Sequence, residues 1–169
     1  MSLATTIATQ LSAIPPQVAT IILAMLPIVE LRGALPVAIA LYKLPVWQAM
    51  LWSIIGNMLP VYLLLIFFEK ASIFASAHSP LAKKILEKLY ERTHGKLHSQ
   101  IEKYGPLALL FFVAVPLPVT GAWTGALAAF VFNLPRKKAF FAILGGVCVA
   151  SVIVTLLTLG ATSAVNAIL

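Results

Sequence analysis

The sequence predicts an all-α integral membrane protein. Of its 169 residues, 61% are hydrophobic and 10% are charged, whereas soluble domains average about 45–50% and about 25%. Residues 1–29, 44–68, 105–135 and 139–169 contain no charged side chain, and each stretch exceeds the roughly 20 residues that cross a bilayer. These observations exclude an ordinary soluble domain, a disordered chain and a disulfide-linked secreted module. We expect two inverted repeats, each a re-entrant helical hairpin followed by a spanning helix.

The first expected repeat covers residues 17–68. Within its hairpin, residues 17–43, the apolar run is interrupted by Pro27 and Pro36, with charged residues between them. Proline removes a helical hydrogen bond and clashes with the preceding turn. Two short helices that meet at mid-membrane therefore fit this run better than one straight helix. Residues 45–68 are continuously apolar and predict a spanning helix.

Residues 69–104 form the polar part of the chain, and their spacing predicts a basic amphipathic helical segment in the cytoplasm. The second expected repeat covers residues 105–160. Its hairpin, residues 105–133, is broken at Pro116 and Pro118, and residues 139–160 predict the second spanning helix.

Two features indicate an internal repeat. Leu44-Pro45 matches Leu134-Pro135 at a spacing of 90 residues, and Gly56 matches Gly146 at the same spacing. Each Leu-Pro pair separates a broken apolar run from a clean one that contains a glycine. Inverted repeats with broken helices at mid-membrane are typical of transporters. A plain bundle of four spanning helices with proline kinks is the alternative.

The net charge of +7 indicates the orientation. If both broken runs are re-entrant, ten of the 12 Lys and Arg residues lie on one side, including Arg136, Lys137 and Lys138. The positive-inside rule makes that side cytoplasmic. We therefore expect a multi-pass protein of the inner membrane with both termini outside. Anionic lipid explains the basic stretch better than nucleic acid does.

Glu30 and Arg32 are the ionisable residues that lie deep in an apolar run. Charges at bilayer depth are costly and usually mark a transport pathway. Arg32 offers a planar fork of donors for a phosphate or carboxylate. Desolvation favours the neutral form of a carboxyl group, so Glu30 is a candidate proton carrier or cation site. A purely structural pair at the hairpin tip is the alternative.

Other residues near the two breaks are candidates for substrate binding, because they offer hydroxyl or amide groups, an aromatic ring or turn-forming backbone. Trp123 and Asn57 have equally plausible packing roles. His94 and His98 lack further ligands for a metal, and no motif for a cofactor or an enzyme is present. The full set of candidates is Glu30, Arg32, Gly33, Pro36, Asn57, Pro116, Pro118, Thr120, Gly121, Trp123 and Thr124.

Two segments together, Glu-Leu-Arg-Gly-Ala-Leu-Pro at 30–36 and Pro-Leu-Pro-Val-Thr-Gly-Ala-Trp-Thr-Gly at 116–125, resemble the small multi-drug export protein family. That family is distantly similar to the DedA/VTT membrane proteins. The resemblance implies paired re-entrant hairpins, proton coupling and, for DedA-like relatives, translocation of lipid-linked phosphates such as undecaprenyl phosphate. Glu30 and Arg32 match the acidic and arginine residues that function there. DedA-like proteins also usually have arginine in the second hairpin, whose tip here has no charge.

The sequence therefore predicts a small secondary transporter, and not an enzyme, for an amphipathic substrate such as a lipid-linked phosphate. Export of small cationic drugs through Glu30 and a non-transporting lipid-binding scaffold are the alternatives. A homodimer is also expected, because two spanning helices and two hairpins are few for a closed pathway. Small residues would allow close contact between the copies, namely Gly121, Gly125, Gly145 and Gly146.

Overall fold

The computed structural model describes residues 3–78, 84, 98–116 and 120–168, and this part of the chain is helical between short connections. The first half contains α1 (Leu3–Gln10), the 3-10 turn η1 (Leu11–Ala13), α2 (Pro16–Met25), α3 (Glu30–Ala40) and α4 (Val46–His78). The second half contains α6 (His98–Ala114), α7 (Ala122–Val131) and α8 (Arg136–Ile168). Among the described residues there is no strand, as the sequence predicts.

The helices α4 and α8 are the two long elements. Each has 33 residues, which corresponds to about 50 Å at 1.5 Å per residue. Their apolar parts, Val46–Ser72 and Arg136–Ser163, are long and apolar enough to cross a membrane. The two predicted long apolar helices are thus confirmed, but both helices extend beyond the predicted 45–68 and 139–160.

The remaining apolar helices are short. With 10 residues in α2, 11 in α3 and 10 in α7, each is about 15 Å long, or half the hydrocarbon thickness of a bilayer. The first broken run does form two helices, and Pro27 lies in the break between them. We expected Pro36 to interrupt a helix as well, but α3 continues through it.

The predicted boundary between the polar segment and the second hairpin is also displaced. We placed it between residues 104 and 105, but α6 begins at His98 and continues through Pro106. The polar residues before the proline form the first turns of the same helix that then becomes apolar. Most of the predicted amphipathic segment, including its expected bend at His94-Gly95, lies outside the described residues.

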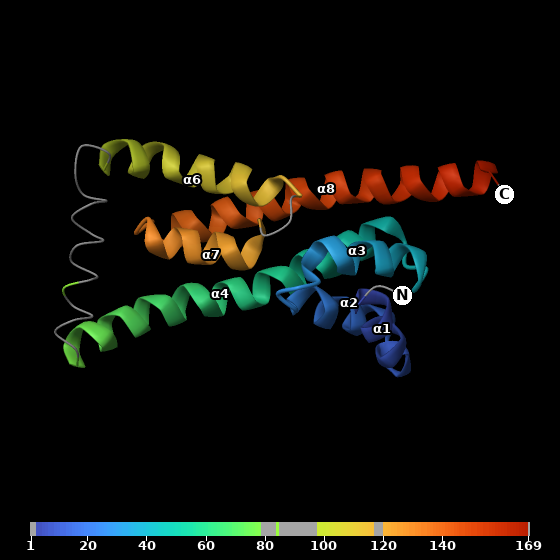
Figure 1. Cartoon of the computed structure of the whole chain (residues 1–169), viewed down its shortest axis with the longest axis horizontal. Helices are drawn as coiled ribbons and strands as arrows, with labels where there is room; N and C mark the ends of the chain where they lie inside the picture. Colours follow the sequence, from blue (N-terminus) through green and yellow to red (C-terminus); the bar gives the residue numbers. More distant parts are fainter. Residues whose placement is uncertain (1–2, 79–83, 85–97, 117–119, 169) are drawn as a thin grey trace.

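The corresponding helices of the two halves run in opposite directions along the long axis of the molecule (Figure 1). The helix α3 runs from the centre toward the end where α1 lies, whereas α7 runs from the centre toward the opposite end. The helices α4 and α8 extend along most of the molecule beside these pairs. As a result, the first residues of α3 and of α7 lie next to each other at the centre.

The turns that precede the two long helices have the same backbone form. Lys43 and Asn133 both have positive φ, 55° and 50°, which is the left-handed conformation that ends many helices. Each is followed by Leu-Pro. The N–H of Ala49 then donates to the Pro45 carbonyl and that of Ala139 to the Pro135 carbonyl, at 3.0 and 2.9 Å. Two equivalent turns thus begin α4 and α8.

The two glycines spaced 90 residues apart also pack in a similar way. A Cβ added to Gly56 would lie 2.5 Å from the Ile21 carbonyl oxygen of α2, and one added to Gly146 would lie 2.7 Å from the Leu110 carbonyl oxygen of α6. Both distances are well below van der Waals contact. In each half, therefore, a glycine of the long helix lets the first helix of the adjacent pair approach closely.

These contacts also revise the expected use of the small residues. Gly125 and Gly145, like Gly146, face side chains of α6, and Gly121 faces Glu30. All four glycines proposed for a dimer interface are therefore used for close packing within the chain. A homodimer stays a prediction, and it would have to form through other residues.

Candidate functional site

The candidate site begins at the first residue of α3. Glu30 has φ of 48° and its exposed fraction is 8%. Its backbone N–H donates to the Leu26 carbonyl at 2.8 Å, which closes the turn between α2 and α3. A left-handed residue with a side chain costs about 1–3 kcal/mol and persists where the surrounding structure holds it. This conformation holds a buried carboxylate at the centre of the molecule.

The Glu30 carboxylate caps the N-terminus of α7. A helix begins with N–H groups that have no partner within the helix, and these groups attract negative charge. Gly121 precedes α7 and has no side chain with which to bond them. Glu30 fills this role from the other half of the chain. The Trp123 N–H donates to Glu30 Oε1 at 3.4 Å, and the Ala122 N–H also interacts with this carboxylate.

The absence of a side chain at Gly121 makes this contact possible. A Cβ at this position would lie 2.6 Å from Glu30 Oε1 and would contact Oε2 even more closely. Its φ of 169° is an extended conformation that any residue adopts. The requirement for glycine is therefore a requirement for space beside the carboxylate.

Arg32 makes the complementary contact at the end of α6. Its Nη2 donates to the Val115 carbonyl at 3.3 Å and to Thr120 Oγ1 at 3.1 Å. The Thr120 hydroxyl in turn donates to the Val115 carbonyl at 2.9 Å. Because the C-terminal end of a helix is electronegative, a guanidinium is favourable directly after Ala114, the last residue of α6.

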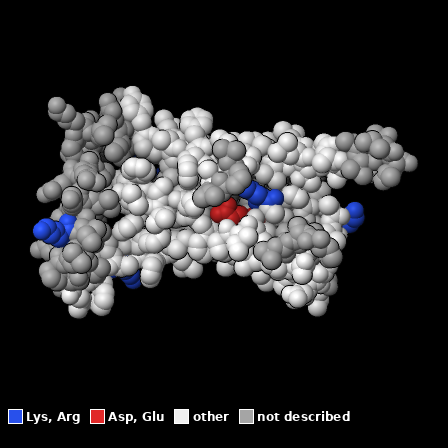
Figure 2. Space-filling view, viewed as in Figure 1, with Lys and Arg blue, Asp and Glu red and all other residues white. Residues whose placement is uncertain are grey.

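Together, Glu30 and Arg32 match the polarity of the break between α6 and α7. The acidic side chain lies at the positive end of α7, and the basic side chain lies at the negative end of α6. This explains why residues 115–121 need no charge of their own. Figure 2 shows an acidic and a basic patch side by side near the centre, on a face whose other charges lie toward its ends.

Several buried polar atoms in the described part of the chain have no hydrogen-bond partner. They are Ser53 Oγ and Asn57 Oδ1 on α4, and Trp123 Nε1 on α7. The exposed fractions of Ser53 and Asn57 are 0% and 3%, and the two are one turn apart. Native proteins rarely leave buried polar groups unpaired. These atoms therefore provide hydrogen-bonding capacity for a polar ligand or for water.

The structure brings together five of the residues predicted for substrate binding: Glu30, Arg32, Thr120, Gly121 and Trp123. The Thr124 hydroxyl donates to the Gly121 carbonyl at 3.2 Å, beside this group. Asn57 forms no hydrogen bond to Glu30 or Arg32 within the described ranges.

The other predicted residues have backbone roles or fall outside the description. The Gly33 N–H donates to the Val29 carbonyl in the first turn of α3, and Pro36 is inside α3. Pro116 directly follows the Val115 carbonyl. Pro118 lies outside the described residues. Sequence reasoning missed that carbonyl and the Ala122 N–H. Both are backbone groups, so no residue type signals them.

A family model described as "Putative small multi-drug export protein" matches residues 30–153. The match begins at Glu30, and it includes the whole contact between α3 and the α6–α7 break. No curated protein and no solved structure matches the chain.

Proposed function

Because the chain belongs to the small multi-drug export protein family, we propose that it is a membrane transporter whose substrate site lies where α3 meets the α6–α7 break. The family description favours a membrane export protein over an enzyme. In our proposal, α2–α3 and α6–α7 are re-entrant hairpins that enter the membrane from opposite faces, while α4 and α8 cross it. The equivalent turns at Lys43 and Asn133 and the matched contacts of Gly56 and Gly146 support inverted repeats.

The proposed orientation places the N-terminus of α8 in the cytoplasm. Arg136 Nη1 forms an ion pair with Glu69 Oε2 at 3.0 Å, so the start of α8 lies beside the end of the apolar part of α4. The basic residues at 136–138 and those of the 69–104 segment then share one side of an inner membrane. Both termini lie on the other side.

The charge balance of the site favours an anionic substrate that is transported with a proton. In the closed contact, the Glu30 carboxylate and the Arg32 guanidinium neutralise each other. Arginine stays charged at all relevant pH values, so protonation of Glu30 leaves one uncompensated positive charge. A phosphate monoester that retains one proton has a single negative charge and restores neutrality, which is important where the dielectric constant is low. A cation at the same place would leave a net positive charge.

The same contact provides a mechanism for coupling. A negative charge at a helix N-terminus contributes about 0.3–1 kcal/mol, and up to about 2 kcal/mol when it is partly buried. Protonation of Glu30 removes this contribution and frees the N–H groups at the start of α7. A phosphate group could then bind these N–H groups together with Arg32. The hairpins would thus separate only when both proton and substrate are present.

We propose that the substrate is an amphipathic anion, specifically a lipid-linked phosphate such as undecaprenyl phosphate. Its head group would bind between the hairpins, and its apolar tail would remain in the lipid around exposed apolar side chains of the helices. The single observation that supports this function best is the buried Glu30 carboxylate at the N-terminus of α7, with Arg32 beside it at the end of α6.

Flux measurements in liposomes test the proposal. The wild-type protein should move a fluorescent short-chain polyprenyl phosphate faster when a pH gradient is imposed. Glu30→Gln mimics the protonated side chain, so we expect flux without dependence on the gradient. Arg32→Gln should reduce flux at least tenfold, whereas Lys70→Gln, which removes an exposed positive charge on α4, should not. Gradient-driven flux that persists in Glu30→Gln would contradict the proposal.

Export of an organic cation in exchange for a proton is the second candidate. Trp123 favours it, because this residue has a half-buried aromatic side chain and its backbone N–H donates to Glu30, and a carboxylate together with an aromatic ring suits such cations. The family description also favours it. In this case Glu30→Gln would abolish export of a cationic dye and Arg32→Gln would preserve it. If the wild-type protein transports neither the phosphate nor the cation, both candidates are excluded.

A further inference from the structure

The end of α2 packs against α4 near the centre of the molecule. Both helices start at the end where α1 lies, and α2 stops at the centre while α4 continues past it (Figure 1). A Cβ added to Gly56 of α4 would lie 2.5 Å from the Ile21 carbonyl oxygen and 2.9 Å from the Ala24 Cβ. Gly56 therefore lies beside the last turns of α2, which ends at Met25.

Two buried polar side chains of α4 adjoin this contact. Asn57 directly follows Gly56, and Ser53 lies one turn before Asn57. At about 100° per residue, both lie within about 100° of Gly56 around the helix. Asn57 Oδ1 and Ser53 Oγ have no hydrogen-bond partner, and native proteins rarely leave buried polar atoms in this state. The side of α4 next to α2 thus has two unpaired oxygen atoms.

The end of α2 is itself electronegative. The last four carbonyl groups of a helix have no partner within it, and the peptide dipoles add up to a partial negative charge there. Here the Leu23 carbonyl accepts the Leu26 N–H at 3.2 Å, where the chain leaves the helix. In membrane transporters, the C-terminal ends of such half-helices coordinate Na⁺. The unpaired oxygens and the helix end therefore favour the same kind of ligand, a cation.

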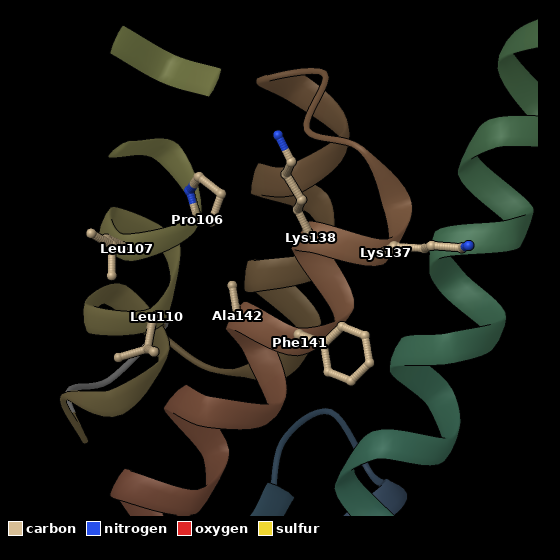
Figure 3. Close-up of a pocket in the computed structure, with 7 residues that line it drawn as sticks. All are labelled: Pro106, Leu107, Leu110, Lys137, Lys138, Phe141 and Ala142. Carbon is tan, nitrogen blue, oxygen red and sulfur yellow. The ribbon is translucent and has the colours of Figure 1, made fainter. Parts of the chain in front are cut away.

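The corresponding helix end in the second half is paired with an arginine. There α6 lies beside α8 (Figure 3), and a Cβ added to Gly146 would lie 2.7 Å from the Leu110 carbonyl oxygen. This packing resembles that of α2 against Gly56. Just after the end of α6, the Val115 carbonyl accepts a hydrogen bond from Arg32 at 3.3 Å. A positive charge thus compensates the electronegative end of α6.

The first half has no charged side chain at the position that corresponds to Arg32. When Gly-Ala-Leu at 33–35 is matched with Gly-Ala-Leu at 125–127, Thr124 takes the place of Arg32. The Thr124 hydroxyl donates to the Gly121 carbonyl at 3.2 Å. A cation from solution would therefore supply at the end of α2 the positive charge that Arg32 supplies at the end of α6.

We propose that the end of α2 binds a monovalent metal cation such as Na⁺, with Asn57 Oδ1 and Ser53 Oγ as side-chain ligands. Both ligands are neutral, whereas divalent cations such as Ca²⁺ are usually held by carboxylates, so a single charge fits the group better. The bound ion would join α2 to α4. The site is separate from the contact of the Glu30 carboxylate with α7 and does not depend on the proposed transport reaction.

Thermal unfolding of the purified full chain in detergent tests the site, with NaCl replacing choline chloride at constant ionic strength. The melting temperature of the wild type should rise with Na⁺ and then saturate, because an ion that binds only the folded state stabilises it. Ser53→Ala and Asn57→Ala should each raise the apparent dissociation constant for Na⁺ at least tenfold. Ser151→Ala is the matched control and should leave this constant unchanged, since it removes a buried hydroxyl of α8 that donates to the Cys148 carbonyl.

Ser53→Ala keeps the test independent of any folding defect in Asn57→Ala. Because the Ser53 hydroxyl has no partner, its loss should not lower the melting temperature in choline chloride. Equal melting temperatures of the wild type in Na⁺ and in choline would overturn the proposal, because water alone would then occupy the site. Equal changes of Na⁺ affinity in Ser53→Ala and Ser151→Ala would overturn it as well.

Discussion

Replacement of Gly121 by alanine is the most informative perturbation of the contact between Glu30 and the start of α7. The added Cβ would lie 2.6 Å from Glu30 Oε1 and 2.7 Å from Glu30 Cδ, whereas ordinary contacts begin near 3.4 Å. The carboxylate must therefore move by about 1 Å. In enzymes, a displacement of this size can lower the reaction rate about 10²-fold. The hydrogen bond from Trp123, at 3.4 Å, is already long, so the movement breaks it.

We expect Gly121→Ala to lower the free energy of unfolding by about 1–3 kcal/mol, as overpacking usually does. Gradient-driven flux in liposomes should fall at least tenfold. Gly160→Ala is the matched control, because a Cβ there has no atom within 4 Å. Thermal unfolding in detergent and flux at equal protein density measure the two effects separately.

A double-mutant cycle identifies Glu30 as the cause. In the Glu30→Ala background the colliding carboxylate is absent, so Gly121→Ala should cost much less stability than it does in the wild type. An equal cost in both backgrounds would refute the reasoning, because the methyl group would then collide with something other than Glu30. Wild-type stability and flux in Gly121→Ala would refute it as well.

Two further predictions concern packing and the arginine contact. Gly56→Ala and Gly146→Ala place a methyl group 2.5 and 2.7 Å from a backbone carbonyl oxygen. Each should therefore lower the free energy of unfolding by at least about 1–3 kcal/mol. Melting temperatures equal to that of the wild type would contradict the close packing of these glycines against α2 and α6. Thr120→Val removes a hydrogen bond of 3.1 Å to a guanidinium, worth about 1.5–3 kcal/mol, and should reduce flux tenfold or more. Thr124→Val is its control, since both hydroxyls donate to a backbone carbonyl but it is Thr120 that Arg32 contacts. Equal flux in the two valine variants would argue against a role for the arginine contact.

The sequence was sufficient for the helical class and for the two long apolar helices, because uninterrupted hydrophobicity over more than 20 residues is specified locally. It also located the first break between α2 and α3. The sequence did not predict that α3 continues through Pro36. Pro36 is the seventh of the 11 residues of α3, where a proline removes one intrahelical hydrogen bond. Residue type alone does not distinguish a proline that a helix accommodates from one that ends it.

The candidate site was predictable in its charged residues and not in its geometry. Glu30 and Arg32 stood out because charge is costly at that depth. Their partners, the N–H groups that begin α7 and the Val115 carbonyl, are backbone groups, and only the fold places them opposite α3. The role of Gly121 depends in the same way on the position of Glu30, and Gly146 is used inside the chain instead of between copies.

Proton uptake on ligand binding tests the central claim, that Glu30 is the group through which substrate and proton are coupled. In weakly buffered detergent solution, a short-chain polyprenyl phosphate should cause the wild-type protein to take up protons, because the anion binds when Glu30 is protonated. In Glu30→Gln the same ligand should bind without proton uptake. Equal proton uptake by the wild type and Glu30→Gln would contradict the account, and so would proton release by the wild type.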